Sequence, residues 1–155
     1  MISPELLRRY PFFGTLSDSQ LRQIAMIADE ESHEAGTILL KENAHADDLY
    51  LLINGSVDLI FTVDEEYHPD RHKEFTVGEI NPGEIFGISA LIEPHQYTST
   101  ARTARVVQVI HINGSALRQR CADDPRLACH LYSQVAKLAL ERLNATRVQL
   151  AAAWA

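Results

Sequence analysis

Residues 83–103 read Gly-Glu-Ile-Phe-Gly-Ile-Ser-Ala-Leu-Ile-Glu-Pro-His-Gln-Tyr-Thr-Ser-Thr-Ala-Arg-Thr, and this stretch decides the fold. It begins at the end of a turn signal, Asn-Pro-Gly at 81–83, and finishes in a strand-like run at 98–103. A second glycine, Gly87, precedes a short segment that we expect to form a turn. The stretch therefore carries two strand-breaking glycines between regions of strand character. Ser89, Thr98, Ser99 and Thr100 carry aliphatic hydroxyl groups near its second glycine and its final strand-like run.

The spacing of five residues resembles the phosphate-binding cassette of cyclic-nucleotide-binding domains. These residues are Gly83, Phe86, Gly87, Ala90 and Leu91. The family includes the effector domains of catabolite-activator-type regulators, cyclic-nucleotide-dependent kinases and gated channels. The resemblance covers about residues 10–150, and the lead-in pattern Pro-Phe-Phe at 11–13 is a second match. It implies a double-stranded β-helix, a jelly-roll-like β-roll flanked by helices, that acts as a regulatory module and not as an enzyme.

Two positions of the cassette depart from the family pattern. The family's Glu, directly after the second glycine, is Ile88 here, and the family's Arg falls on Tyr97. The resemblance implies that the turn at 87–92 keeps backbone amide donors for an anion. Replacing the Arg and the Glu costs about 1.5–3 and 1–3 kcal/mol of ligand binding, a weakening of roughly a hundred- to ten-thousand-fold. The candidate ligand pocket comprises Gly87, Ile88, Ser89, Ala90, Tyr97, Thr98 and Ser99.

Three interpretations of this pocket remain open. The domain binds no nucleotide and works through protein contacts, or it takes a different, less anionic effector, or it binds a cyclic nucleotide through altered contacts. Arg102 is the nearest substitute for the family's Arg, but a regular strand turns it to the opposite face from Tyr97. Glu93 falls on the wrong side of the turn to replace the family's Glu. We expect no cofactor, with cyclic nucleotide kept as an alternative ligand.

The middle of the chain has the alternation of β-strands. The strand-like runs are 30–34, 37–41, 48–53, 56–63, 73–80, 98–103 and 105–112. Many short strands at this spacing are typical of a sandwich or barrel, so the fold class is α+β and mainly β. Asn54 and Gly55 tolerate positive φ and predict a tight hairpin. The polar segment 64–72, which includes Pro69, predicts a loop between two strands.

Helical signals stand at the beginning of the chain. Ser3 and Pro4 predict a short helix over 4–9, with Ser3 as the N-cap. Ser17 and Gln20 form a capping box, which predicts a second helix from about Asp18. Its apolar stripe consists of Leu21, Ile24, Ala25 and Ile27. We divide the single domain into a helical lead-in (1–28), a β-roll (29–113) and C-terminal helices (114–155).

The C-terminal part predicts a short helix over 114–120 and then a long one. A capping acid at 123–124 precedes Pro125, and nothing breaks a helix of roughly 28 residues up to about Ala152. Leu131, Val135 and Leu138 are expected to face the β-core. A second set of apolar residues follows a partner-helix spacing and predicts a homodimer: Leu140, Leu143, Leu150 and Trp154. The alternative is a helix that folds back onto its own domain.

Bulk properties limit the partners. The formal net charge is −7, which suits neither DNA nor anionic membranes through a general electrostatic footprint. We expect no DNA-reading module after the long helix, either because this is a stand-alone domain or because it is one part of a larger protein. No apolar run approaches the ~20 residues of a membrane span, and the first residues lack a signal-peptide core. Cys121 and Cys129 are predicted to be buried thiols. We expect a cytoplasmic protein that binds a small effector and neither nucleic acid nor membrane.

Seven histidines raise the alternative of a metal-dependent enzyme on a double-stranded β-helix. Such a site calls for a His-x-His pair, which the chain lacks, and His68 and His72 share only a loop spacing. Gly-x-Ser-x-Gly and Walker motifs are also missing from the sequence. The residues therefore favour a regulatory domain without a catalytic or metal site.

Overall fold

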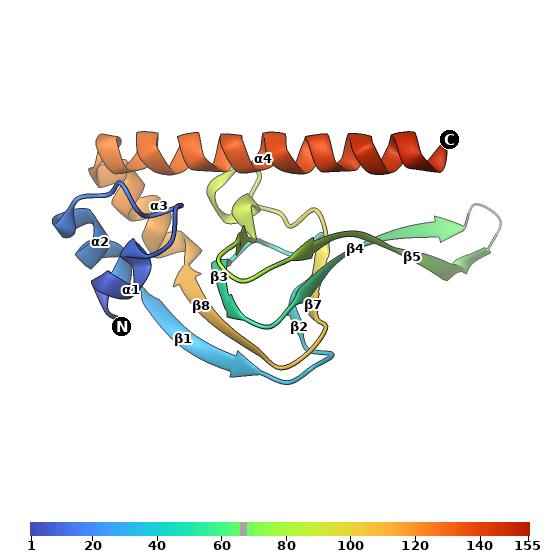
Figure 1. Cartoon of the computed structure of the whole chain (residues 1–155), viewed down its shortest axis with the longest axis horizontal. Coiled ribbons are helices and arrows are strands. Elements are labelled where there is room, and N and C mark those ends of the chain that lie inside the picture. The colour runs from blue at the N-terminus through green and yellow to red at the C-terminus, as the bar shows by residue number, and fades with distance from the viewer. Residues whose placement is uncertain (66–67) are drawn as a thin grey trace.

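The computed structural model describes residues 1–65 and 68–155. Its strands form two antiparallel four-stranded sheets, with strand orders β1-β8-β3-β6 and β2-β7-β4-β5. The sheets curve into a roll beneath a long C-terminal helix, with short helices at the N-terminal end (Figure 1). This arrangement confirms the predicted β-roll flanked by helices. The strands are β1 (Ala28–His33), β2 (Ile38–Leu40), β3 (Asp48–Asn54), β4 (Val57–Glu65), β5 (His68–Ile80), β6 (Ile85–Phe86), β7 (Thr100–Thr103) and β8 (Val107–Asn113).

The N-terminal helices are α1 (Pro4–Arg8) and α2 (Asp18–Ala25). The predicted capping box is present, because the Ser17 hydroxyl accepts from the Gln20 amide and the Gln20 side chain accepts from the Ser17 amide. Ser3 stands at the N-cap of α1, yet its side chain accepts no capping hydrogen bond. The stripe of α2 faces inward as predicted, with Leu21, Ile24 and Ala25 buried and Ile27 half-buried.

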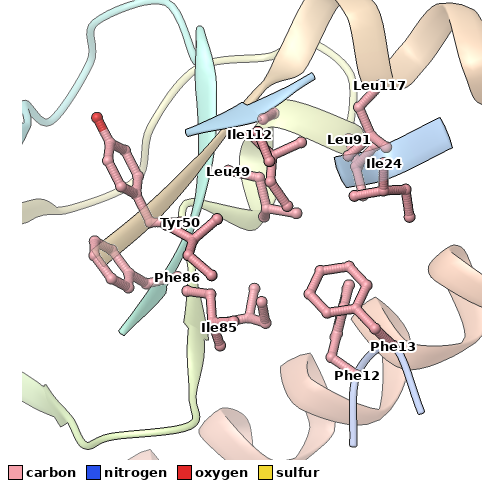
Figure 2. Packing of buried hydrophobic residues seen from close by; sticks show 14 of the residues in the cluster. Phe12, Phe13, Ile24, Leu49, Tyr50, Ile85, Phe86, Leu91, Ile112 and Leu117 are labelled. Carbon is pink, nitrogen blue, oxygen red and sulfur yellow. The ribbon is translucent and has the colours of Figure 1, made fainter. Parts of the chain in front are cut away.

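The core lies between the first sheet and the helices. Leu49 of β3 and Ile112 of β8 lie beside Ile24, Leu91 and Leu117, which come from three helical segments (Figure 2). All five side chains are nearly or fully buried. Each buried side chain of this size contributes about 1.5–3 kcal/mol through removal of apolar surface from water. This packing holds the helices against the outside of the roll.

The opposite face of the same sheet points into the roll. Tyr50 stacks on Phe86 with ring centroids 5.1 Å apart, and its hydroxyl donates to the carbonyl oxygen of Leu39 at 3.3 Å. Burial raises the pKa of Tyr50 above its ordinary value, so the phenol stays protonated and can donate. β6 pairs with β3 through Phe86 opposite Tyr50 and Ile85 opposite Leu51. This two-residue strand lies inside the 83–103 stretch and was not predicted.

The hairpin predicted at Asn54 and Gly55 is wrong. β3 belongs to the first sheet and β4 to the second, so the turn carries the chain between sheets and does not pair its flanking strands. Gly55 has φ +100°, and a Cβ there would lie 2.6 Å from the carbonyl oxygen of Val106. The turn signal was correct, but turn chemistry does not determine which strands pair.

The loop predicted at 64–72 is also wrong over most of its length. β4 continues to Glu65 and β5 begins at His68, with Asp64 opposite His72 in the ladder. The hairpin extends beyond the roll (Figure 1), where both faces meet solvent, so polar side chains do not oppose strand formation. Residues 66–67 lie outside the described residues.

The C-terminal helices are α3 (Gly114–Asp123) and α4 (Pro125–Ala153). Asp124 caps α4, because its carboxylate accepts from the amides of Arg126 and Leu127 at 3.1 and 3.2 Å. The predicted inward face is confirmed, with Leu131 and Val135 buried and Leu138 packed against the core. In the described part of the chain, no helix combines the length and the apolar character needed to cross a membrane.

The cysteine prediction is only half correct. Cys121 is buried, and burial raises the pKa of its thiol. Cys129 is exposed because it lies two residues from Leu127 and Leu131, both of which are buried on the inward face of α4. Positions two apart on a helix point in different directions.

Candidate functional site

Gly87 of the cassette meets two structural demands. Gly87 has φ +77°, a region that L side chains rarely adopt, and it precedes the short helix η1 (Ile88–Leu91). A Cβ on Gly87 would lie 3.0 Å from the carbonyl oxygen of Asp48 and 3.2 Å from Leu40. Glycine is therefore required both for the backbone angle and for the close approach to β3. Ala90 and Leu91 of η1 are buried in the core.

Tyr97 forms part of the scaffold of this pocket. Its hydroxyl donates to the carbonyl oxygen of Asp48 at 2.7 Å and accepts from the amide of Asp48 at 3.0 Å. The side chain is buried, and burial raises its pKa to about 12. The phenol therefore holds Asp48, the first residue of β3, against the cassette. Tyr97 stands at the position of the family's Arg, and its hydroxyl group is used in both of these hydrogen bonds.

The remaining predicted pocket residues surround a very small cavity. Ile88, Ser89, Thr98 and Ser99 line it together with Gly87 and Tyr97, and its volume is about 30 Å³. That volume is close to the share of one water molecule in the liquid, about 30 Å³. Ala90 does not line the cavity and instead belongs to the buried core. The space between these residues alone is therefore small.

Two arginines from the C-terminal helices hold the cassette. Arg118 of α3 donates to the carbonyl oxygen of Ala90 at 2.6 Å, and Arg142 of α4 donates to the carbonyl oxygen of Ile85. The side chain of Arg142 is partly buried, and burial lowers its pKa while Glu84 and Glu141 oppose that shift. Sequence reasoning missed both residues, and it assigned no cation to the pocket.

Arg142 also borders two larger cavities. One of about 420 Å³ lies between β5, the cassette and the middle of α4, and it includes Val77, Ile80 and Ala145 in its lining. The other, about 340 Å³, lies on the far side of η1 beside Pro94 and Ala139. Small-molecule pockets typically measure about 300–1,000 Å³, so both of these cavities, which lie between residues of the 83–103 stretch and α4, have the size of a small-ligand pocket.

The fold and this geometry are matched by a family model. The cyclic nucleotide-binding domain model matches residues 30–124, which includes the cassette and the β-roll except for the first two residues of β1. The chain belongs to the cyclic nucleotide-binding domain family. The predicted family resemblance is thereby confirmed.

Relatives and solved structures extend this assignment. A CRP-like cAMP-activated global transcriptional regulator from Mycobacterium tuberculosis is 26% identical over 95% of this chain and 61% of its own length. The chain thus spans about three fifths of that regulator. A crystal structure of a candidate cyclic nucleotide-binding protein from Geobacter metallireducens has a TM-score of 0.79 and 41% identity, covering 92% of this chain and 99% of its own. A cyclic nucleotide-binding domain from Methylobacillus flagellatus shares the fold, with TM-score 0.75 and 19% identity over 94% of this chain and 78% of its own.

Neither substitute considered from the sequence takes the place of the family's Arg or Glu. Arg102 lies 3.5 Å from Glu74 in an ion pair across the second sheet and does not line the cassette cavity. Glu93 is exposed and lines only the outer cavity beside η1. Thr100, the other hydroxyl considered near the cassette, instead accepts from the amide of Glu42. The only charge that reaches the cassette cavity from the residues lining it is that of Arg142, which comes from a different element.

The histidines pair mainly with single carboxylates. His33 and His111 both approach Glu31, at 2.9 and 3.0 Å, and His45 lies 2.8 Å from Asp47. Among residues 1–64 and 72–155, whose side chains the structure describes, no three His, Cys, Asp or Glu side chains are grouped so that they could hold a metal ion. The sequence analysis considered His68 and His72 as a pair in a loop, but both residues lie in the strand β5.

The predicted seam residues all lie on the surface. Leu140, Leu143, Leu150 and Trp154 are 66%, 45%, 59% and 84% exposed. They occupy the half of α4 that extends past the roll above the β4–β5 hairpin (Figure 1). The helix as a whole lies on its own domain, with Leu131 and Val135 buried and Arg142 hydrogen-bonded to Ile85, while the four seam side chains stay exposed, and the homodimer stays a prediction.

Proposed function

We propose that this domain is a non-catalytic regulatory module whose pocket under α4 takes a small effector without the family's usual contacts to a cyclic nucleotide. One observation carries the proposal. Tyr97 stands where the family has Arg, and its hydroxyl is fully engaged with the backbone of Asp48. A cyclic phosphate at the cassette would meet an apolar Ile88 and a phenol that cannot turn to it without breaking two hydrogen bonds.

Energetics support this proposal. Breaking a buried hydrogen bond and leaving a group unpaired costs about 1–3 kcal/mol. This cost comes in addition to the loss of the binding free energy that the family's Glu and Arg would have supplied. The cassette cavity of about 30 Å³ is too small to hold a nucleotide by itself, so such a ligand would also have to occupy the adjoining cavity of about 420 Å³. Cyclic nucleotide in the family's usual position is therefore strongly disfavoured.

A non-catalytic role fits the chemistry of the pocket. Its hydroxyl groups belong to Ser89, Thr98 and Ser99. Across the described residues, none of them hydrogen-bonds to a histidine or a carboxylate that could activate it as a nucleophile. We expect no cofactor for the same reason, since the pocket offers no group of metal-binding side chains.

The alternative is a receptor that binds cyclic nucleotide through altered contacts, and Arg142 is the observation that favours it. The test is thermal unfolding and calorimetric titration with cyclic AMP and cyclic GMP. We expect no rise in melting temperature at low micromolar nucleotide. A clear rise at that concentration would contradict the proposal and support the alternative.

A designed variant sharpens this test. Ile88→Glu restores the family's ribose acceptor and should strengthen nucleotide binding by roughly 5- to 150-fold, equivalent to about 1–3 kcal/mol. Ile88→Gln is the matched control, because it adds a polar group of the same length without the charge. Equal affinities of both variants and the wild type would show that the missing Glu does not limit nucleotide binding.

The partner we propose is a second copy of this chain. The exposed seam of α4 gives apolar side chains at alternating spacings of three and four, with Arg147 at the one polar position. Contiguous apolar patches of this kind on a surface mark interfaces. We propose no direct contact with nucleic acid, in keeping with the net charge of −7.

A further inference from the structure

The outer face of α4 carries a stripe of mainly apolar residues that is longer than the predicted seam. At about 100° per residue, eight exposed positions of the helix fall within a sector of about 80°, on the side away from Leu131 and Val135. These positions are Cys129, Tyr132, Ala136, Leu140, Leu143, Arg147, Leu150 and Trp154. The stripe therefore begins at Cys129 and not at Leu140, and it continues over the half of α4 that is packed on the domain.

The length of the stripe suits a paired helix. Residues 140–154 span only two heptads, whereas coiled coils are sustained over about three to four. From residue 129 to residue 154 the stripe covers 25 helical steps, close to seven full turns at about 3.6 residues each. It combines one 11-residue repeat with two 7-residue repeats, whose supercoils have opposite hands. A second helix can therefore follow it with little supercoiling, and α4 is straight in the structure (Figure 1).

The stripe has nearly the same pattern when it is read from either end. Its midpoint lies between residues 141 and 142. The mirrored pairs are Leu140 with Leu143, Ala136 with Arg147, and Cys129 with Trp154, while Tyr132 falls one position short of mirroring Leu150. A two-fold interface asks for such a surface, because residue i of one copy contacts residue j of the other and the reverse. An antiparallel second copy would place the small Ala136 opposite Arg147 and Cys129 opposite Trp154, so that large side chains meet small ones.

Charge also favours the antiparallel direction. Arg147 is the one charged residue of the stripe. In a parallel pair in register, the two Arg147 guanidinium groups would face each other across an apolar seam, which is unfavourable for like charges. In an antiparallel pair, each lies at the level of the partner's Ala136, so the two are about 16 Å apart along the helix axis. The exposed ring of the partner's Tyr132, one turn away, then offers its face to the cation.

We propose that the outer face of α4, from Cys129 to Trp154, binds a second copy of this chain in the antiparallel direction. The two-fold axis passes the helix between residues 141 and 142, with Leu140 and Leu143 of both copies at the centre of the interface. The two domains then lie on opposite sides of the helix pair. This inference rests on the proposed function for the identity of the partner, and it adds the extent of the surface and the direction of the partner helix.

Disulfide crosslinking of the full chain reads this direction. Sedimentation velocity comes first, and we expect a dimer. Oxidation with copper–phenanthroline then links two thiols only where their Cα atoms come within about 7 Å of each other. The exposed Cys129 serves as a native reporter. In the antiparallel pair the two Cys129 residues are about 37 Å apart along the axis, so the wild type should form no crosslinked dimer, whereas a parallel pair would bring them to the same level.

A designed pair of cysteines supplies the positive result. In a Cys129→Ser background, Ala136→Cys combined with Arg147→Cys should crosslink at least about tenfold faster than either single variant, because only the combination brings two thiols together. The two single variants are the matched controls. Sedimentation of the reduced proteins verifies that each variant still dimerises. The wild-type measurement needs no substitution, so it stands even where a variant fails to fold.

Two crosslinking results would overturn the inference alone. One is a disulfide between two Cys129 residues in the wild type, and the other is crosslinking by Ala136→Cys alone at the rate of the combined variant. Both would indicate a parallel pair and would leave the homodimer of the proposed function intact. A wild type that sediments as a monomer would contradict that homodimer and this inference together, so the two failures are distinguishable.

Discussion

The two halves of α4 have similar sequences and opposite environments. In the first half, Leu127, Leu131 and Val135 are buried against the roll and the N-terminal helices. In the second half, Leu143 and Leu150 are exposed. Both halves are rich in leucine and alanine, so composition does not separate them. The difference lies in what stands opposite: the core faces the first half, whereas a cavity lined by β5 residues lies between the second half and the sheet.

Arg142 lies where the helix passes from one environment to the other. Before it, Leu138 still packs against the core. After it, the helix extends over the projecting hairpin (Figure 1). The comparison shows that one helix performs two tasks, stabilising the domain with one half and presenting a surface with the other. The cavity of about 420 Å³ lies at this boundary, and under the proposed function an effector there would contact both the cassette and α4.

The largest expected effect comes from the buried half. Leu131→Ala should lower the free energy of unfolding by about 2–5 kcal/mol, because it leaves a cavity in a fully buried position. Val148→Ala, in the exposed half and outside the seam, should change it by less than about 0.5 kcal/mol. Urea denaturation of both variants measures the difference. Equal losses of stability would show that the two halves contribute alike.

A smaller effect is expected at the beginning of the buried half. Asp124→Ala removes the carboxylate that accepts from the amides of Arg126 and Leu127, so stability should fall by about 0.5–2 kcal/mol. Asp123→Ala is the control, since that carboxylate accepts from the Gln119 side chain and caps no helix amide. The same denaturation experiment applies. If Asp123→Ala were as destabilising, the effect would come from general charge changes and not from the cap.

The smallest effect on folding, and the largest on association, is expected in the exposed half. Leu143→Glu combined with Leu150→Glu should convert a dimer to a monomer in sedimentation velocity, with little change in the unfolding of the monomer. Val148→Glu tests specificity, because it places the same charge at an exposed position of the same helix that lies between Arg147 and Leu150 but is not part of the seam. A wild type that already sediments as a monomer would refute the seam.

Local signals in the sequence predicted much of this fold. The capping box at Ser17 and the cap before Pro125 were both found from residue types alone, since a cap depends on neighbours three positions away. The inward positions of Leu131 and Val135 followed from helical spacing. The cassette glycines were recognised by their pattern, and Gly87 proved to need both its positive φ and its missing side chain.

Non-local features escaped prediction for a common reason. The turn at Gly55 was identified, but its strands joined different sheets, because pairing depends on partners such as Val106 that lie far along the chain. The strands at 56–63 and 73–80 were predicted, but the outer part of their hairpin, 64–72, was predicted to be a loop, since strands exposed on both faces lose the apolar alternation that marks a strand. Arg142 was missed because nothing in its helix indicates which loop it approaches.

The sequence by itself determined the family, the helix ends and the absence of the family's Glu and Arg from the cassette, because each depends on residue identity at short spacing. The tertiary structure alone decided that Tyr97 is bound to Asp48, that the space between the predicted pocket residues alone is small, and that Arg142 supplies a cation from α4. These are interactions between segments far apart in the chain. Their existence depends on how the sheets and helices pack, which local spacing does not encode.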